Sequence, residues 1–164
     1  MILVIDLEAS CDEGDKLPAD EMEMIEVGAL WATPDGRILA EFQALVRPVL
    51  HPRLTPFCTQ LTGITQADVD GAPLFPEVAA RLASFAQLHQ AEGARWGSWG
   101  QYDAKQLARD CARHGIVNPL ASFEHINLKR QFAKTRKIKE VGMARALQMI
   151  GLPRSEEHTS ELQS

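Results

Sequence analysis

The 164-residue sequence contains no apolar run approaching ~18 residues, so we expect no membrane-spanning segment. Its start has no basic region followed by a cleavage site, which argues against a secretory signal peptide. Cysteine is scarce: Cys11, Cys58 and Cys111 form neither a CxxC pair nor a metal-type cluster. Reduced thiols in a cytoplasmic protein are therefore the expectation.

An excess of positive charge is also missing. The formal net charge is -5, which argues against a non-specific polyanion binder that works through a basic surface. It does not exclude a nucleic-acid enzyme, because active-site carboxylates count as negative until divalent ions bind them. A hydrophobic content of 45% over this length suits one domain with a sizeable core.

The order of apolar patterns predicts an α/β fold, a mixed sheet with flanking helices. Residues 1–10 read as a buried strand, and two more strands flank the turn signal "PDG", which gives an antiparallel meander. The stretch 51–72 is broken by proline and glycine and suits short helical turns more than regular structure. Short strands are expected in 94–100 and at the start of 123–135, where a helix follows. Helical spacing covers 73–90, 102–115 and 140–153.

Two acids end the first strand, in the sequence "MILVIDLE". Period two places Asp6 and Glu8 on one strand face and Leu7 on the other. Two carboxylates at the end of a core strand cost desolvation energy and repel each other unless a cation compensates. Their oxygens are hard ligands that suit Mg²⁺ or Mn²⁺. The motif alone leaves a metal site and a solvated strand end equally open.

The other candidate residues also have purely structural interpretations. Asp103 follows "WGSWGQY" where a strand passes into a helix, so it is either a ligand or an acid favoured by the helix dipole. Phe57, in "FCTQLTGIT", either packs in a loop or stacks on a nucleic-acid base, and Trp99 has the same two interpretations. The basic stretch "NLKRQFAKTRKIK" is either a solvated face or a track for a phosphate backbone.

Taken together, these motifs resemble a known family. "DLEASC", "MIEVGAL", "FCTQLTGIT", "FPEV", "WGSWGQYD" and "INLKRQFA" occur in the order seen in DEDD-type (DEDDh) 3′-5′ exonucleases. The first motif is most similar to the Eri1/3′hExo-like branch, which includes the KapD-like proteins, whereas proofreading exonucleases usually show "DTETTG". The resemblance runs from about Ile2 to Pro153.

The resemblance implies an RNase H-like fold and two divalent ions, Mg²⁺ or Mn²⁺. Asp6, Glu8 and Asp103 match the family's metal-binding catalytic acids. Five further residues match positions that line the terminal-nucleotide pocket: Ala9, Ser10, Phe57, Leu61 and Trp99. The implied chemistry is a two-metal, in-line hydrolysis of the last phosphodiester.

The end of the chain departs from the family. The pattern requires a histidine general base with an aspartate five residues later, but Gln163 stands five residues after His158. The segment "RSEEHTSELQS" instead matches a translated reading frame of a common short-read sequencing adapter. We therefore interpret 1–153 as an exonuclease domain truncated at its C-terminus and 154–164 as a non-native, adapter-derived tail. The chain as written is then expected to be inactive or nearly so.

The sequence thus predicts a metal-dependent 3′-5′ exonuclease acting on 3′ ends of RNA or of other single strands. A non-catalytic nucleic-acid-binding module with the same fold is the alternative from another class. A DNA proofreading subunit docked on a polymerase is the third possibility. Protein partners cannot be read from the sequence.

Overall fold

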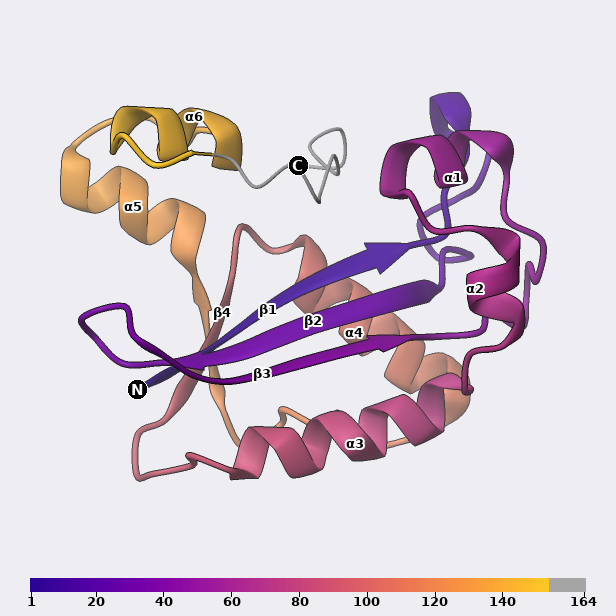
Figure 1. The fold of residues 1–164 in the computed structure, drawn as a ribbon, viewed down its shortest axis with the longest axis horizontal. Helices are drawn as coiled ribbons and strands as arrows, with labels where there is room; N and C mark the ends of the chain where they lie inside the picture. Colours follow the sequence, from indigo (N-terminus) through magenta and orange to yellow (C-terminus); the bar gives the residue numbers. More distant parts are fainter. Residues whose placement is uncertain (154–164) are drawn as a thin grey trace.

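In the computed structural model, which describes residues 1–153, five strands form one mixed sheet in the order β3-β2-β1-β4-β5 (Figure 1). Strands β1 (Ile2–Ala9), β2 (Met24–Ala32) and β3 (Ile38–Leu45) form the predicted antiparallel meander. Strands β4 (Arg95–Ser98) and β5 (Glu124–Asn127) add in parallel on the other side of β1. The mixed α/β sheet predicted from the sequence is confirmed.

One face of this sheet carries the main core. Leu3, Ile5 and Leu7 of β1 are buried in one apolar cluster with residues of α3 (Phe75–Gln87) and α4 (Tyr102–His114). Figure 1 shows α3 on one side of the strands, with α5 (Leu128–Arg136) and α6 (Met143–Met149) on the other. The alternation of β1 therefore directs its even-numbered residues away from this core.

The segment between β3 and α3 is more regular than the sequence predicts. It forms two short helices, α1 (Pro56–Thr62) and α2 (Gln66–Asp70), rather than helical turns alone. Local caps explain the difference: Thr55 accepts a hydrogen bond from the N–H of Cys58, and Thr65 forms a capping box with Asp68. Around these helices lies a second apolar cluster that includes Cys58 and Leu61.

The remaining elements are brief. A 3-10 helix, η1 (Glu13–Asp15), follows β1. Helix α6 begins at Met143, later than the predicted stretch 140–153, and Gly151 just beyond its end has a φ of 72°, as a glycine that closes a helix does. No helix within residues 1–153 is both long and apolar enough to cross a membrane. The predicted tail 154–164, with His158 and Gln163, lies outside the described residues.

Candidate active site

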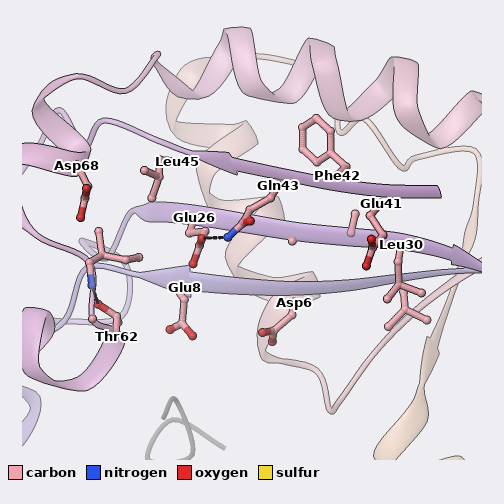
Figure 2. A pocket seen from close by; sticks show the side chains of 15 residues that line it. Asp6, Glu8, Glu26, Leu30, Glu41, Phe42, Gln43, Leu45, Thr62 and Asp68 are labelled. Atoms are coloured by element: carbon pink, nitrogen blue, oxygen red, sulfur yellow. Dashed lines mark hydrogen bonds between the residues drawn. The ribbon is translucent and has the colours of Figure 1, made fainter. Parts of the chain in front are cut away.

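The two acids of the first strand share the sheet face opposite the main core. Figure 2 shows the side chains of Asp6 and Glu8 on the same side of β1. Asp6 is exposed, whereas Glu8 is only 3% exposed. Gly28 of β2 stands opposite Asp6 in the register and adds no side chain to this face. The period-two prediction is confirmed, and the face above Asp6 stays open.

Asp103 approaches the same strand from the start of α4. Its Oδ1 accepts a hydrogen bond of 2.9 Å from the backbone N–H of Leu7, the residue between the two acids of β1. Gly100, at a φ of 108°, allows the turn from β4 into this helix. The side chain is only 5% exposed, so Asp103 is anchored in the protein rather than solvated as a simple helix-terminal acid.

The pKa of Asp103 reflects its burial and the neighbouring charge of Asp6. Burial raises the pKa of Asp103 from its ordinary 3.8 to about 6, and the negative charge of Asp6 acts in the same direction. The hydrogen bond from Leu7 opposes this shift only in part. A cation among these carboxylates would relieve both causes, because it favours the charged form of each acid.

The donor set therefore fits hard divalent ions, with Asp6, Glu8 and Asp103 as the residues that would hold them. Within residues 1–153, however, no group of three or more histidine, cysteine, aspartate or glutamate side chains is arranged as a ready-made metal cage. The carboxylates of β1 and α4 lie at one end of the sheet, but their side chains are not already arranged as the ligands of an ion.

The five residues expected in a nucleotide pocket differ in their exposure. Ala9 is fully buried, and Leu61 is 8% exposed within the second apolar cluster. Ser10 is also buried, because its Oγ accepts a hydrogen bond of 2.9 Å from the N–H of Glu23. Phe57 and Trp99 are only partly buried, so these two rings have surface to offer a ligand.

A hollow of about 870 Å³ extends from the strand acids across the open face of the sheet. Its rim toward β3 and α2 carries further carboxylates, Glu26, Glu41 and Asp68 (Figure 2). Gln43 donates a hydrogen bond of 2.6 Å to Oε1 of Glu26, which fixes one of them. This flank of the site is therefore negatively charged.

Sequence reasoning missed Tyr102, whose hydroxyl is buried at the start of α4 without a hydrogen-bond partner among residues 1–153. Burial raises the pKa of this phenol, and the charges of Asp103, Cys11 and Glu8 act in the same direction. Its position directly before Asp103 is the only sequence signal. A neutral hydroxyl in this place is a donor beside the acids of the site.

Comparison with known proteins gives consistent matches. Residues 3–161 match the family model RNase_T, described as Exonuclease. ERI1 exoribonuclease 3 of Homo sapiens is 34% identical over 169 residues, which cover 93% of this chain and 48% of that protein. The 3'-5' exoribonuclease 1 of Homo sapiens is 32% identical over 145 residues, which cover 84% and 40%. The chain thus spans about half the length of the curated relatives it matches.

Solved structures agree with these matches. The nuclease domain of 3'hExo, a DEDDh family member bound to rAMP, superimposes with a TM-score of 0.84 at 26% identity. That match covers 98% of this chain and 84% of the other. A 3'-exonuclease in specific recognition of the 3' end of a histone mRNA stem-loop gives 0.85 at 27% identity, covering 98% and 74%. The RNase H-like fold predicted from the sequence is confirmed.

Proposed function

Because the chain belongs to the RNase_T exonuclease family, we propose that it removes nucleotides from the 3′ ends of single-stranded RNA in a reaction that requires Mg²⁺ or Mn²⁺. The observation that carries this proposal is the hydrogen bond from the Leu7 N–H to Asp103, which ties the third acid to the strand that bears Asp6 and Glu8. The RNA preference is supported by relatives named as exoribonucleases and by the rAMP bound to the 3'hExo nuclease domain.

Each acid has a distinct part in this proposal. Asp6 is the exposed carboxylate and faces the substrate side, whereas Glu8 and Asp103 are buried and hold their charge where ions would neutralise it. Two divalent ions supply an activated water and stabilise the leaving 3′ oxygen when they are bound. Burial and the charge of Asp6 raise the pKa of Asp103 to about 6, and a divalent ion held there would favour the charged form of this acid.

The partly exposed rings would receive the terminal nucleotide. Phe57 lies on α1, which follows β3, and Trp99 lies between β4 and α4, four residues before Asp103. Aromatic faces bind every base by stacking, which suits an enzyme that shortens strands of any sequence. Leu61 belongs to the second apolar cluster, against which Phe57 packs, and offers little surface of its own.

Stepwise shortening of a 5′-labelled single-stranded RNA in Mn²⁺ tests the proposal. The segment 154–164 does not match the histidine–aspartate spacing that the family resemblance implies, so we expect little activity from this chain. A version continued after Pro153 by the source genome should shorten the RNA from its 3′ end, and Asp6→Asn in that version should abolish the reaction. Comparable rates with and without the continuation would contradict the prediction that the chain ending in 154–164 is inactive.

Inactivity of both versions would refute the nuclease proposal. RNA binding without hydrolysis in both would favour the non-catalytic binding module instead. Preference for DNA by more than about tenfold, equivalent to 1.4 kcal/mol, would favour the proofreading alternative. A cytoplasmic location, which only the cysteine pattern suggests, stays a prediction.

A further inference from the structure

Helix α5 lies on the same sheet face as Asp6 and Glu8. In the register of β1 and β4, Gly97 stands beside Val4, whose side chain lines the hollow together with the two acids. A Cβ added to Gly97 would meet Cγ and Cδ2 of Leu128 at 2.9 Å. Leu128, the first residue of α5, therefore fills the place of the missing side chain and anchors the helix to this face.

This helix and its C-terminal extension carry a concentrated positive charge. We define the α5 basic segment by six residues: Lys129, Arg130, Lys134, Arg136, Lys137 and Lys139. No acid occurs from 127 to 139, although the whole chain is acidic. Arg130 is exposed and forms a weak surface ion pair with Glu140 at 3.5 Å. Four more of the six residues are also exposed: Lys134, Arg136, Lys137 and Lys139. Such a concentration of like charge is repulsive unless an anion lies against it.

Aromatic and cationic groups connect this segment to the site. The rings of Trp99 and Phe132 have centroids 5.7 Å apart, and the guanidinium of Arg136 lies 5.0 Å from the centroid of Phe132. Trp99, Phe132 and Arg136 therefore form a continuous row of contacts. It leads from the turn between β4 and α4, just before Asp103, to the basic surface of α5. The indole Nε1 of Trp99 is buried and has no hydrogen-bond partner among the described residues.

The opposite flank of the open face has the reverse charge. Glu26, Glu41 and Asp68 line the hollow on the side of β3 and α2. A polyanion whose end lies at Asp6 would be repelled along that flank and attracted along α5. The shape of the open face would allow a strand to leave along β3 and α2 or along α5, and the charge distribution favours the path along α5.

We propose that the α5 basic segment binds the phosphates of the RNA strand upstream of its 3′ end, so that the strand leaves the site over Trp99 and α5. This inference rests on the proposed function and adds the path of the substrate to it. The terminal nucleotide contacts the Phe57 and Trp99 rings, and the nucleotides before it contact α5. A dinucleotide is then too short to benefit from the segment, and a longer strand gains from each phosphate it places there.

Binding of fluorescent RNAs of two and ten nucleotides, measured by anisotropy over a range of salt, tests this path. The last linkages are phosphorothioates so that hydrolysis is slow. In Lys134→Gln/Lys139→Gln, two exposed cations are lost, and the slope of log K against log salt should fall by about 1.4 for the ten-nucleotide RNA. At 0.1 M salt this corresponds to a loss of affinity of up to about 25-fold. The two-nucleotide RNA should lose less than about twofold.

The matched control is Lys16→Gln/Arg81→Gln, which removes the same charge from exposed positions outside α5. Its binding of the longer RNA should change little, because Arg81 lies on α3 across the sheet. Equal losses in the two double variants would overturn the proposal, since overall charge alone would then explain them. An unchanged salt slope in the α5 variant would also overturn it.

These outcomes are separable from those of the proposed function. If the chain binds the dinucleotide, or its continued version shortens RNA, while the α5 variant binds the ten-nucleotide RNA normally, only the path is refuted. If the unaltered chain binds neither RNA and the continued version shortens none, both proposals fail. Arg136→Gln gives a further readout: loss of the cation at Phe132 should weaken the longer RNA selectively and leave the melting temperature nearly unchanged, because Arg136 is exposed.

Discussion

Replacing Asp103 by asparagine should stabilise the metal-free protein. The carboxylate is only 5% exposed, and its pKa is raised from 3.8 to about 6. A shift of about 2 units disfavours the charged form in the folded state by about 3 kcal/mol at pH 8. Asparagine keeps the shape and an oxygen that accepts from the N–H of Leu7, but it carries no charge. The variant should therefore lose the penalty and keep the contact.

The pH dependence gives the sign of this effect. Below pH 3.8 the acid is protonated in both states, so the penalty is absent. As the pH rises from 3.8 to about 6, the unfolded chain releases its proton before the folded one, and the folded state loses stability. The gain from Asp103→Asn should therefore be near zero at pH 3.5 and complete by pH 8. In EDTA it corresponds to a rise in melting temperature of about 6 to 12 °C.

Urea unfolding at both pH values, with EDTA or with Mg²⁺, measures the effect. Mg²⁺ should stabilise the unaltered chain and have a smaller effect on Asp103→Asn, which has lost a charged ligand. Asp110→Asn is the matched control on the same helix. Asp110 is also buried but accepts hydrogen bonds from Gln106, the N–H of Met24 and, at 2.6 Å, Arg113. Its replacement should cost about 2 to 4 kcal/mol.

A destabilised Asp103→Asn at pH 8 in EDTA would refute the reasoning. It would mean that this carboxylate is already compensated in the protein, as Asp110 is, and that its burial is no argument for a bound cation. A gain that persisted unchanged at pH 3.5 would also refute it, because it could not then arise from ionisation.

Two further substitutions test the supports of the site. Gly97→Ala should lower the free energy of unfolding in urea by about 1 to 3 kcal/mol, because the added Cβ must displace Leu128. The control Gly28→Ala should cost less than about 1 kcal/mol, because its Cβ would meet only a carbonyl oxygen at 3.9 Å. Equal costs would contradict the anchoring of α5 by Leu128. Glu23→Gln should destabilise the protein by about 2 kcal/mol, because the buried carboxylate accepts hydrogen bonds from the backbone N–H groups of 49–51. Cleavage by chymotrypsin near that loop should then accelerate. An unchanged cleavage rate would contradict the inference that Glu23 holds the loop in place.

Much of the site could be predicted because it lies on a strand. Side chains alternate along a regular strand, and the register shift of β1 falls after Glu8, so the spacing of Asp6 and Glu8 fixes their common face. The apolar residues before them require burial, and that requirement places the acids at the end of β1 beside the core. Asp103 could be placed at the start of a helix from local pattern, but its contact with Leu7 spans 96 residues and depends on the sheet order.

The residues of the expected nucleotide pocket were harder to predict. Burial depends on which distant segments pack together, and sequence pattern does not show that Ser10 bonds to Glu23 or that Leu61 joins the second cluster. The family resemblance names positions but not their exposure. Tyr102 could not be predicted from the sequence, because a single buried hydroxyl produces no periodic pattern and no spaced motif.

The contrast between the two buried aspartates of α4 shows why burial alone does not identify a functional acid. Asp103 and Asp110 are seven residues apart, so they lie on one face of the helix, and both are at most 5% exposed. Asp110 faces Arg113 and holds β2 to the helix through the N–H of Met24. Asp103 faces the like charge of Asp6 instead. A fold that needed only stability would not keep two negative groups there, so their proximity points to a cationic ligand as the compensating partner.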